Sequence, residues 1–337
     1  MSGFPLYRFP VVVLRELFQQ LSLPEIFNIS ICSKKSQGNV EFLMRKGKSL
    51  EVGLNATENC MISVQRNEEH FHVKVAEFSE LREKPEVTTH VSINGESVTV
   101  AIIGQTLFVT DKKRVLKEVT KHVLKVFRCQ LQEARIGNYC SSHIPTWVVD
   151  LINEQQGPIE SLWVDAKNPS VKDISHLFTK AKVSDELICL FEYTSKGPRP
   201  AIKMGKMSMK RFDNHSSSWM TIEHMLNLSF ETGTLSESSF KSKDLSRFLE
   251  HWMAGGCDRL QELCIETEGF INYSEMLRGI EHELISPDDI RTYNSKVYKN
   301  TVGICGGTQI RRRSDGRIAR LVNVGTLSKS FSLVVFE

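Results

Sequence analysis

The stretch Asp244-Leu245-Ser246-Arg247-Phe248-Leu249-Glu250-His251-Trp252-Met253-Ala254-Gly255-Gly256 decides how the second half of the chain folds. Its large apolar residues recur at helical spacing and share one face: Leu245, Phe248, Leu249 and Trp252. Gly255 and Gly256 end this helix, because glycine tolerates the left-handed backbone that closes many helices. A strand begins soon afterwards, at Leu260. The stretch therefore predicts a helix that packs its apolar face on a sheet, and core packing explains the apolar residues without a ligand.

Working outward, strand-like and helical pieces alternate through the surrounding sequence. These pieces cover residues 160–164, 171–179, 186–192, 225–230, 242–253 and 260–265. Such alternation is typical of stacked α/β units, in which each strand lines one face and its helix covers the other. The period is loose, so the sequence predicts irregular leucine-rich-like units. The chain is then expected to end in a hairpin that turns at Asp315-Gly316, followed by an apolar strand over 331–336.

The sequence before this region predicts short strands closed by a helix. Alternating stretches occur at 49–54, 61–65, 71–75 and 90–100. Asn94-Gly95 lies between two alternating runs and predicts a two-residue hairpin. Helical spacing over 111–129, with Asp111 as the cap, predicts the helix.

The first fifty residues predict three short helices. Pro10 can begin the first helix, Ser22 and Glu25 form a possible capping box for the second, and Gly47 ends the third. The first helix has a wide apolar stripe, and a unit of this size rarely stabilises itself. The stripe is therefore expected to lean on the rest of the chain or on a partner.

Composition excludes several classes of protein. The 337 residues include 43 basic and 40 acidic side chains, a balance that lacks the broad positive field of nucleic-acid-binding proteins. We expect no nucleic-acid partner. No window approaches the roughly eighteen apolar residues of a membrane span, and the N-terminus lacks the pattern of a signal peptide, so no membrane association is expected. The eight cysteines are scattered, which suits reduced thiols in the cytoplasm or nucleus.

No catalytic or cofactor-binding motif was found. GxSxG, HExxH and the dinucleotide fingerprint are absent, and Gly303-Ile304-Cys305-Gly306-Gly307 lacks the lysine of a phosphate loop and predicts a turn. His70 and His72 share a strand face but have no identifiable third metal ligand. We therefore expect no enzyme activity, no catalytic residue, no cofactor and no metal.

One basic cluster could bind an acidic or phosphorylated partner. It consists of Arg311, Arg312, Arg313, Arg317 and Arg320. The alternative is that these arginines only keep an edge strand soluble.

Two parts of the sequence resemble one known family. Residues 9–21, FPVVVLRELFQQL, followed by 23–35, LPEIFNISICSKK, resemble the F-box. The resemblance is to the nematode family in which an F-box precedes an F-box-associated domain. Residues 219–226 and 244–256 resemble that associated domain. Ser22-Leu23 stands where many F-boxes have an aspartate, and the third helix lacks their tryptophan.

The resemblance implies an α+β fold with three segments: an F-box over 1–47, a β-rich segment over 48–130 and an F-box-associated, leucine-rich-like domain over 131–337. It also implies a substrate-recognition subunit of a Skp-cullin-F-box ubiquitin ligase. The F-box would bind a Skp-family adaptor and, through it, a cullin-RING ligase, while the last segment recruits an unknown protein substrate. The candidate adaptor-binding residues are Phe9, Pro10, Val13, Leu14, Leu17, Phe18, Leu21, Pro24 and Ile26.

Three alternatives stay open. The apolar residues could pack the core of the helical module itself instead of binding an adaptor. The protein could also be an interaction scaffold that acts without the ligase, or an enzyme with an unfamiliar site.

Overall fold

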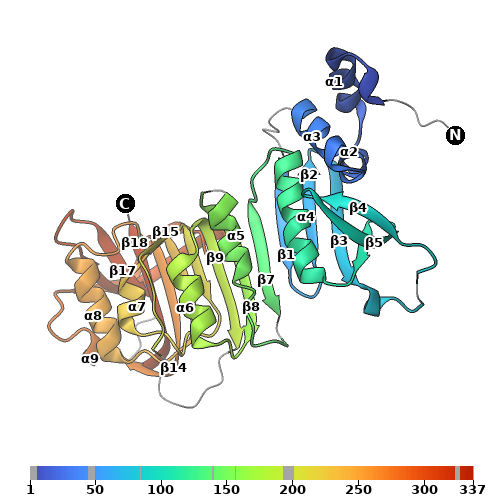
Figure 1. Ribbon diagram of the computed structural model, residues 1–337. Helices are drawn as coiled ribbons and strands as arrows, with labels where there is room; N and C mark the ends of the chain where they lie inside the picture. The colour runs from blue at the N-terminus through green and yellow to red at the C-terminus, as the bar shows by residue number, and fades with distance from the viewer. Residues whose placement is uncertain are drawn as a thin grey trace. The chain divides into compact units, whose positions relative to one another are not determined.

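The computed structural model describes residues 6–44, 50–83, 85–138, 140–155, 157–192, 201–322 and 327–336. The chain divides into two compact units, Met1–Ile136 with Glu154–Gln156 and Gly137–Asn153 with Gly157–Glu337. Both contain helices and sheet (Figure 1), so the chain is α+β. The sequence predicts three segments, with boundaries after residues 47 and 130. This division is finer than the two compact units and stays a prediction.

The first unit begins with three short helices, after a 3-10 turn at Leu6–Arg8. They are α1 (Val11–Gln20), α2 (Leu23–Ile31) and α3 (Lys34–Leu43). The start of α2 is held as the sequence predicts, because the backbone N–H of Ser22 donates to the Glu25 carboxylate at 2.8 Å. The third helix already ends at Leu43, and the predicted stop at Gly47 lies outside the described residues.

A twisted sheet and one long helix complete this unit. The strands are β1 (Leu50–Ala56), β2 (Met61–Arg66), β3 (Glu69–Glu77), β4 (Thr89–Ile93), β5 (Glu96–Ile103), β6 (Thr106–Val109) and β7 (Glu133–Asn138), with a 3-10 turn at Phe78–Glu80. They lie in the order β7-β1-β2-β3-β6-β5-β4. The predicted hairpin joins β4 to β5, with positive φ angles of 49° at Asn94 and 82° at Gly95. The predicted helix is α4 (Lys112–Val126), and its cap Asp111 accepts from the N–H of Arg114 at 2.9 Å.

The helical module shares its core with this sheet. The ring of Phe27 on α2 lies 5.4 Å from that of Phe71 on β3 and 5.8 Å from the imidazole of His122 on α4. His122 is fully buried and forms two hydrogen bonds, through Nε2 with the Ser30 hydroxyl at 2.7 Å and through Nδ1 with the N–H of Asn94 at 2.9 Å. The helical module therefore packs against the rest of the first unit. The sequence alone leaves open whether it packs on the rest of the chain or on a partner.

The second unit contains a sheet with helices over one face (Figure 1). Its helices are α5 (Trp147–Gln155), α6 (Val171–Lys180), α7 (Ile222–Leu226), α8 (Ser242–Met253) and α9 (Tyr273–Met276). The strands are β8 (Ile159–Lys167), β9 (Val183–Glu192), β11 (Arg211–Asn214), β13 (Thr232–Ser238), β14 (Glu262–Asn272), β15 (Glu283–Ser295), β16 (Asn300–Arg311), β17 (Ile318–Val322) and β18 (Leu327–Phe336). A separate small sheet pairs β10 (Met207–Ser208) with β12 (Leu228–Ser229).

The strand order supports stacked α/β units followed by an antiparallel end. The sheet of this unit runs β15-β16-β17-β18-β14-β13-β11-β9-β8, and β8, β9, β11, β13 and β14 pair in parallel. Apolar residues of α6 and α8 pack on it: Phe178 contacts Phe212, and Phe248 contacts Phe331, at 6.2 and 6.3 Å between ring centroids. The predicted C-terminal hairpin is confirmed: β16 and β17 pair antiparallel, and Arg311 opposite Ile318 is the last pair before the turn.

The piece over 225–230 contains the end of α7 and the two-residue strand β12. One sequence prediction was wrong here. Gly303–Gly307 is not a turn but part of β16, where Gly306 and Gly307 lie opposite a bulge in β15. A local glycine pattern cannot distinguish a turn from a bulged strand, because the distinction depends on the neighbouring strand.

Candidate functional site

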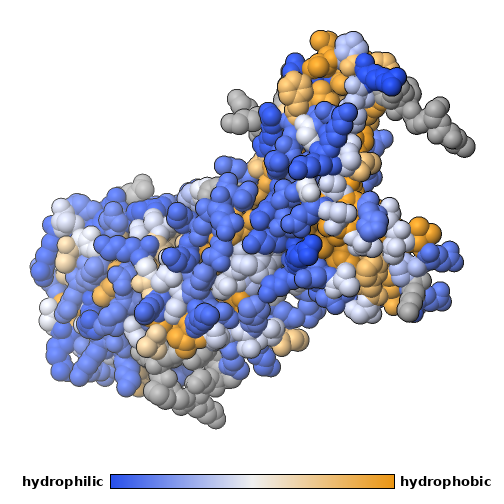
Figure 2. Space-filling view, viewed as in Figure 1, coloured by the Kyte–Doolittle hydropathy of each residue, from blue (hydrophilic) through white to orange (hydrophobic). Residues whose placement is uncertain are grey.

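An exposed apolar patch covers one side of the helical module. On α1, Val11, Val12, Val13 and Leu17 are exposed, and Phe9 lies just before the helix; on α3, Phe42 is exposed beside Arg15, whose guanidinium lies 5.7 Å from the ring centroid. We call Val11, Val12, Val13, Leu17 and Phe42 the α1 patch. Figure 2 shows the corresponding apolar surface over this end of the unit. Exposed apolar clusters of this kind typically mark contact sites for other proteins.

The structure separates the nine candidate adaptor-binding residues into three groups by their exposure. Phe9, Pro10, Val13 and Leu17 are exposed, and Leu21 and Pro24 are half-buried. Leu14, Phe18 and Ile26 are buried in the module's own core. Leu14 and Leu17 illustrate the difference, with 6% and 40% of their surface exposed.

Sequence reasoning missed part of the patch. Val11, Val12 and Phe42 were not among the candidates, although three consecutive valines at 11–13 were a usable signal. Consecutive residues point about 100° apart around a helix, so a single core-facing stripe cannot bury all three.

The arginine cluster does not form a single basic surface. Arg312 and Arg320 are buried, with 2% and 4% of their surface exposed. Arg312 forms an ion pair with Asp315 and lies 5.3 Å from the ring centroid of Trp252, and Arg320 pairs with Asp289 at 3.1 Å. Both arginines therefore act inside the fold, which corrects the idea that all five face a partner.

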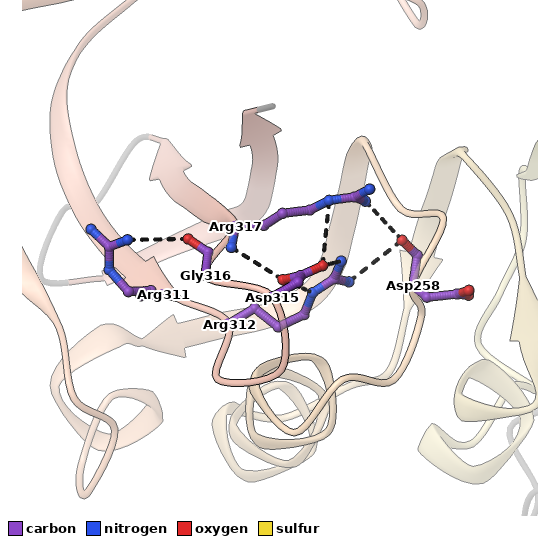
Figure 3. Close-up of polar contacts among 6 residues, drawn as sticks. All are labelled: Asp258, Arg311, Arg312, Asp315, Gly316 and Arg317. Atoms are coloured by element: carbon purple, nitrogen blue, oxygen red, sulfur yellow. Dashed lines mark hydrogen bonds and ion pairs between the residues drawn. The ribbon is translucent and has the colours of Figure 1, made fainter.

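The other three arginines, Arg311, Arg313 and Arg317, are exposed around the β16–β17 turn. Figure 3 shows the contacts of Arg311 and Arg317. Arg317 donates to the carbonyl oxygen of Asp258 at 3.0 Å, and Arg311 donates to that of Gly316 at 3.1 Å. Hydrogen bonds from Arg312 and Arg317 hold the pKa of Asp315 far below its usual range. Asp315 offsets one of the positive charges at this turn. The partner-binding role of Arg311, Arg313 and Arg317 stays a prediction.

An open cleft of about 640 Å³ lies at the start of α8. Phe240 and Phe270 line it together with charges of both signs, Lys241 and Lys243 against Glu268 and Glu275. Such a mixed lining indicates no particular small molecule.

Within the described residues, no group of three or more His, Cys, Asp and Glu side chains is placed to hold a metal ion. None of the helices in that part of the chain has the length and apolar character needed to cross a membrane.

Comparison with known proteins places one family region in the second unit. Residues 203–265 match the family model described as "F-box associated". This region contains α7, α8 and the strands β11 and β13, which belong to the parallel part of the sheet.

Two curated relatives from Caenorhabditis elegans were found. An E3 ubiquitin-protein ligase, hecw-1, is 28% identical over 82 residues, which are 24% of this chain and 6% of the relative. The uncharacterized protein F59B2.9 is 22% identical over 157 residues, which are 46% of this chain and 35% of the relative. The chain therefore spans well under half the length of either relative. No solved structure matches.

Proposed function

We propose that this protein is the substrate-recognition subunit of a Skp-cullin-F-box type ubiquitin ligase. The observation that carries the proposal is the exposed α1 patch, in a chain whose second unit contains an F-box-associated region. The sequence resemblance of residues 9–35 to the F-box points to the same function.

The α1 patch has the properties of a helix-in-groove contact. Val13 and Leu17 lie one turn apart on α1 and present apolar surface, while Leu14 and Phe18 anchor the same helix to the module. Burying such side chains in a hydrophobic cleft of a Skp-family adaptor contributes about 1 to 2 kcal/mol each. The proposed adaptor contact is thus the α1 patch together with Phe9 and Pro10, and the buried candidates hold the module together.

The second unit supplies the other half of the proposed function. Its F-box-associated region would capture a protein substrate, while the cullin-RING subunits bring the enzyme that carries ubiquitin. This chain would accelerate the transfer by proximity, performing no chemistry itself. The proposal places the protein in the cytoplasm or nucleus.

The adaptor contact is tested by co-purifying the full chain with a Skp-family adaptor. The variant Val13→Asp, Leu17→Asp should lose at least about a hundredfold in affinity, because it would bury two carboxylates in an apolar contact. Both residues are exposed in the free chain, so the fold should be kept. The matched control is Gln19→Asp, Gln20→Asp, which adds the same charge at two exposed polar positions of α1.

If both variants bind the adaptor equally well, the α1 patch is not part of the adaptor contact. If the wild-type chain also fails to bind the adaptor, the scaffold that acts without the ligase becomes the better explanation.

A further inference from the structure

Strand β15 forms an open edge of the second unit. Among the strands that the structure describes, β15 pairs with β16 alone and ends the sheet. It is 13 residues long. An edge strand presents backbone N–H and C=O groups that can hydrogen-bond to a further strand.

Only the first half of this edge is protected. The pairing register shifts between Ile285 and Ile290, and the segment between them contains Pro287, Asp288 and Asp289. A bulge, a proline and acidic side chains are the usual features that prevent an edge strand from pairing. From Ile290 to Ser295 the strand pairs regularly with β16, and its one charged residue, Arg291, has its guanidinium 3.7 Å from the ring centroid of Phe336. Alternate residues of this six-residue stretch therefore point their backbone N–H and C=O groups to the open side, where they can pair with a further strand.

Exposed apolar side chains gather along the same edge. Leu284 and Ile290 on β15, and Tyr298 in the turn after it, are each more than half exposed, at 77%, 63% and 61%. Covering them would add a hydrophobic contribution to backbone pairing.

The stretch Ile290–Ser295 is flanked by opposite charges at its two ends. Asp288 and Asp289 lie in the bulge, and Lys296 and Lys299 lie in the turn that follows the strand. Asp289 pairs with Arg320 and Lys296 with Glu231, at 3.1 and 3.3 Å. Asp288 and Lys299 form no ion pair within the described part of the chain, so one charge at each end stays available.

We propose that β15 pairs antiparallel with β15 of a second copy of this chain, forming a symmetric dimer. Antiparallel pairing about a two-fold axis places the start of each strand beside the end of the other, and thus Asp288 near Lys299 of the second copy. The same charge contact occurs twice, which favours a second copy over an unrelated extended peptide. The proposal does not depend on adaptor binding, because the edge and the α1 patch belong to different compact units.

Sedimentation equilibrium of the full chain measures this association. Asp288→Lys places a lysine opposite Lys299 of the second copy, and Lys299→Glu places a glutamate opposite Asp288. Because each change replaces two attractive contacts of the dimer by repulsive ones, each variant should raise the dimer Kd about tenfold. Mixing the two variants should produce a heterodimer with nearly wild-type affinity, and the double variant in one chain should also recover it. The control is Lys172→Glu, an exposed change of equal charge on α6.

Amide exchange gives a second readout. Protection of the backbone N–H groups within Ile290–Ser295 that point away from β16 should rise with protein concentration, since the dimer adds hydrogen bonds to them. A chain that stays monomeric at every concentration overturns the proposal. So does a dimer that both single variants leave unchanged, because the contact would then lie on another surface.

Discussion

His122 links three parts of the first unit through a buried neutral imidazole. It joins Ser30 on α2 to the backbone of Asn94 in the hairpin, and burial together with the nearby Lys125 lowers its pKa to about 4. Because Nδ1 accepts the N–H of Asn94, a second ring proton would break that hydrogen bond.

The stability of the first unit should therefore fall on acidification. Above about pH 6.5 the imidazole is neutral in both the folded and the unfolded chain; below it only the unfolded chain takes up the proton, until the folded group titrates near pH 4. The loss over this window should be on the order of 3 kcal/mol, and His122→Gln should remove it. Hydrogen exchange of the α4 amides in wild type and variant, at pH 7 and pH 5, measures the effect.

Tryptophan fluorescence supplies an internal control for that experiment. All four tryptophans, Trp147, Trp163, Trp219 and Trp252, belong to the second unit. His122→Gln should leave the fluorescence-monitored unfolding of this unit unchanged; an equal shift there would mean that the acid effect has another origin.

Glu262 is a second residue whose role comes from its surroundings. Its buried carboxylate accepts from the hydroxyls of Tyr293 and Ser295 at 2.9 and 2.8 Å, and from the N–H of Lys296 at 3.1 Å. Burial and the bond to Glu262 raise the pKa of Tyr293 far above its usual value. One side chain thus ties the end of β15 to β14.

Glu262→Ala should destabilise the second unit by about 2 to 4 kcal/mol, because the buried donors lose their acceptor. Chemical unfolding followed by tryptophan fluorescence measures this. Glu266→Ala, at an exposed position of the same strand, is the control and should change little. Similar values for the two variants would contradict the proposed tie.

At the scale of elements, β16 depends on two glycines. Gly307 has a φ of 108°, and a Cβ added there would lie 2.5 Å from the carbonyl oxygen of Leu321 on β17. Gly306 also has positive φ and would bring a Cβ within 3.0 Å of the backbone of β15. At these two positions β16 therefore approaches the backbones of β15 and β17 too closely to accept a side chain.

Gly307→Ala should cost about 2 kcal/mol or more, since it combines a strained backbone with a backbone clash. Gly303→Ala is the matched control in the same strand, because its Cβ would meet only a methyl group of Ile290 at 3.8 Å. Thermal unfolding of the two variants compares them, and equal stability would show that β16 can shift to accept the side chain.

The positions of the helices were predicted more accurately from the sequence than the pairing of the strands. The apolar spacing of α8 and the caps Ser22 and Asp111 are local features, and the structure has the helices where these features put them. The Asn94-Gly95 hairpin is likewise local, because a two-residue turn selects its own backbone angles. Asp315-Gly316 lies in the longer connection over 312–317, where Gly316 supplies a positive φ of 76°.

At the scale of the whole molecule, the two proposed interaction surfaces lie on different units. The α1 patch belongs to the first unit, and the β15 edge belongs to the second, which also carries the F-box-associated region. A dimer through β15 would carry two α1 patches, and two adaptors could then act on one assembly.

The amino-acid sequence by itself determined the α+β class, most helices, both hairpins and the amphipathic stripe of α1, because these follow from periodicity and turn chemistry within a few residues. Only the tertiary structure decided which apolar residues of that stripe stay exposed, as Leu17 does, and which arginines become internal, as Arg312 does. It alone also made β15 the edge of the sheet. Burial and charge pairing depend on which distant segments meet, and the spacing of residues along the chain does not contain that information.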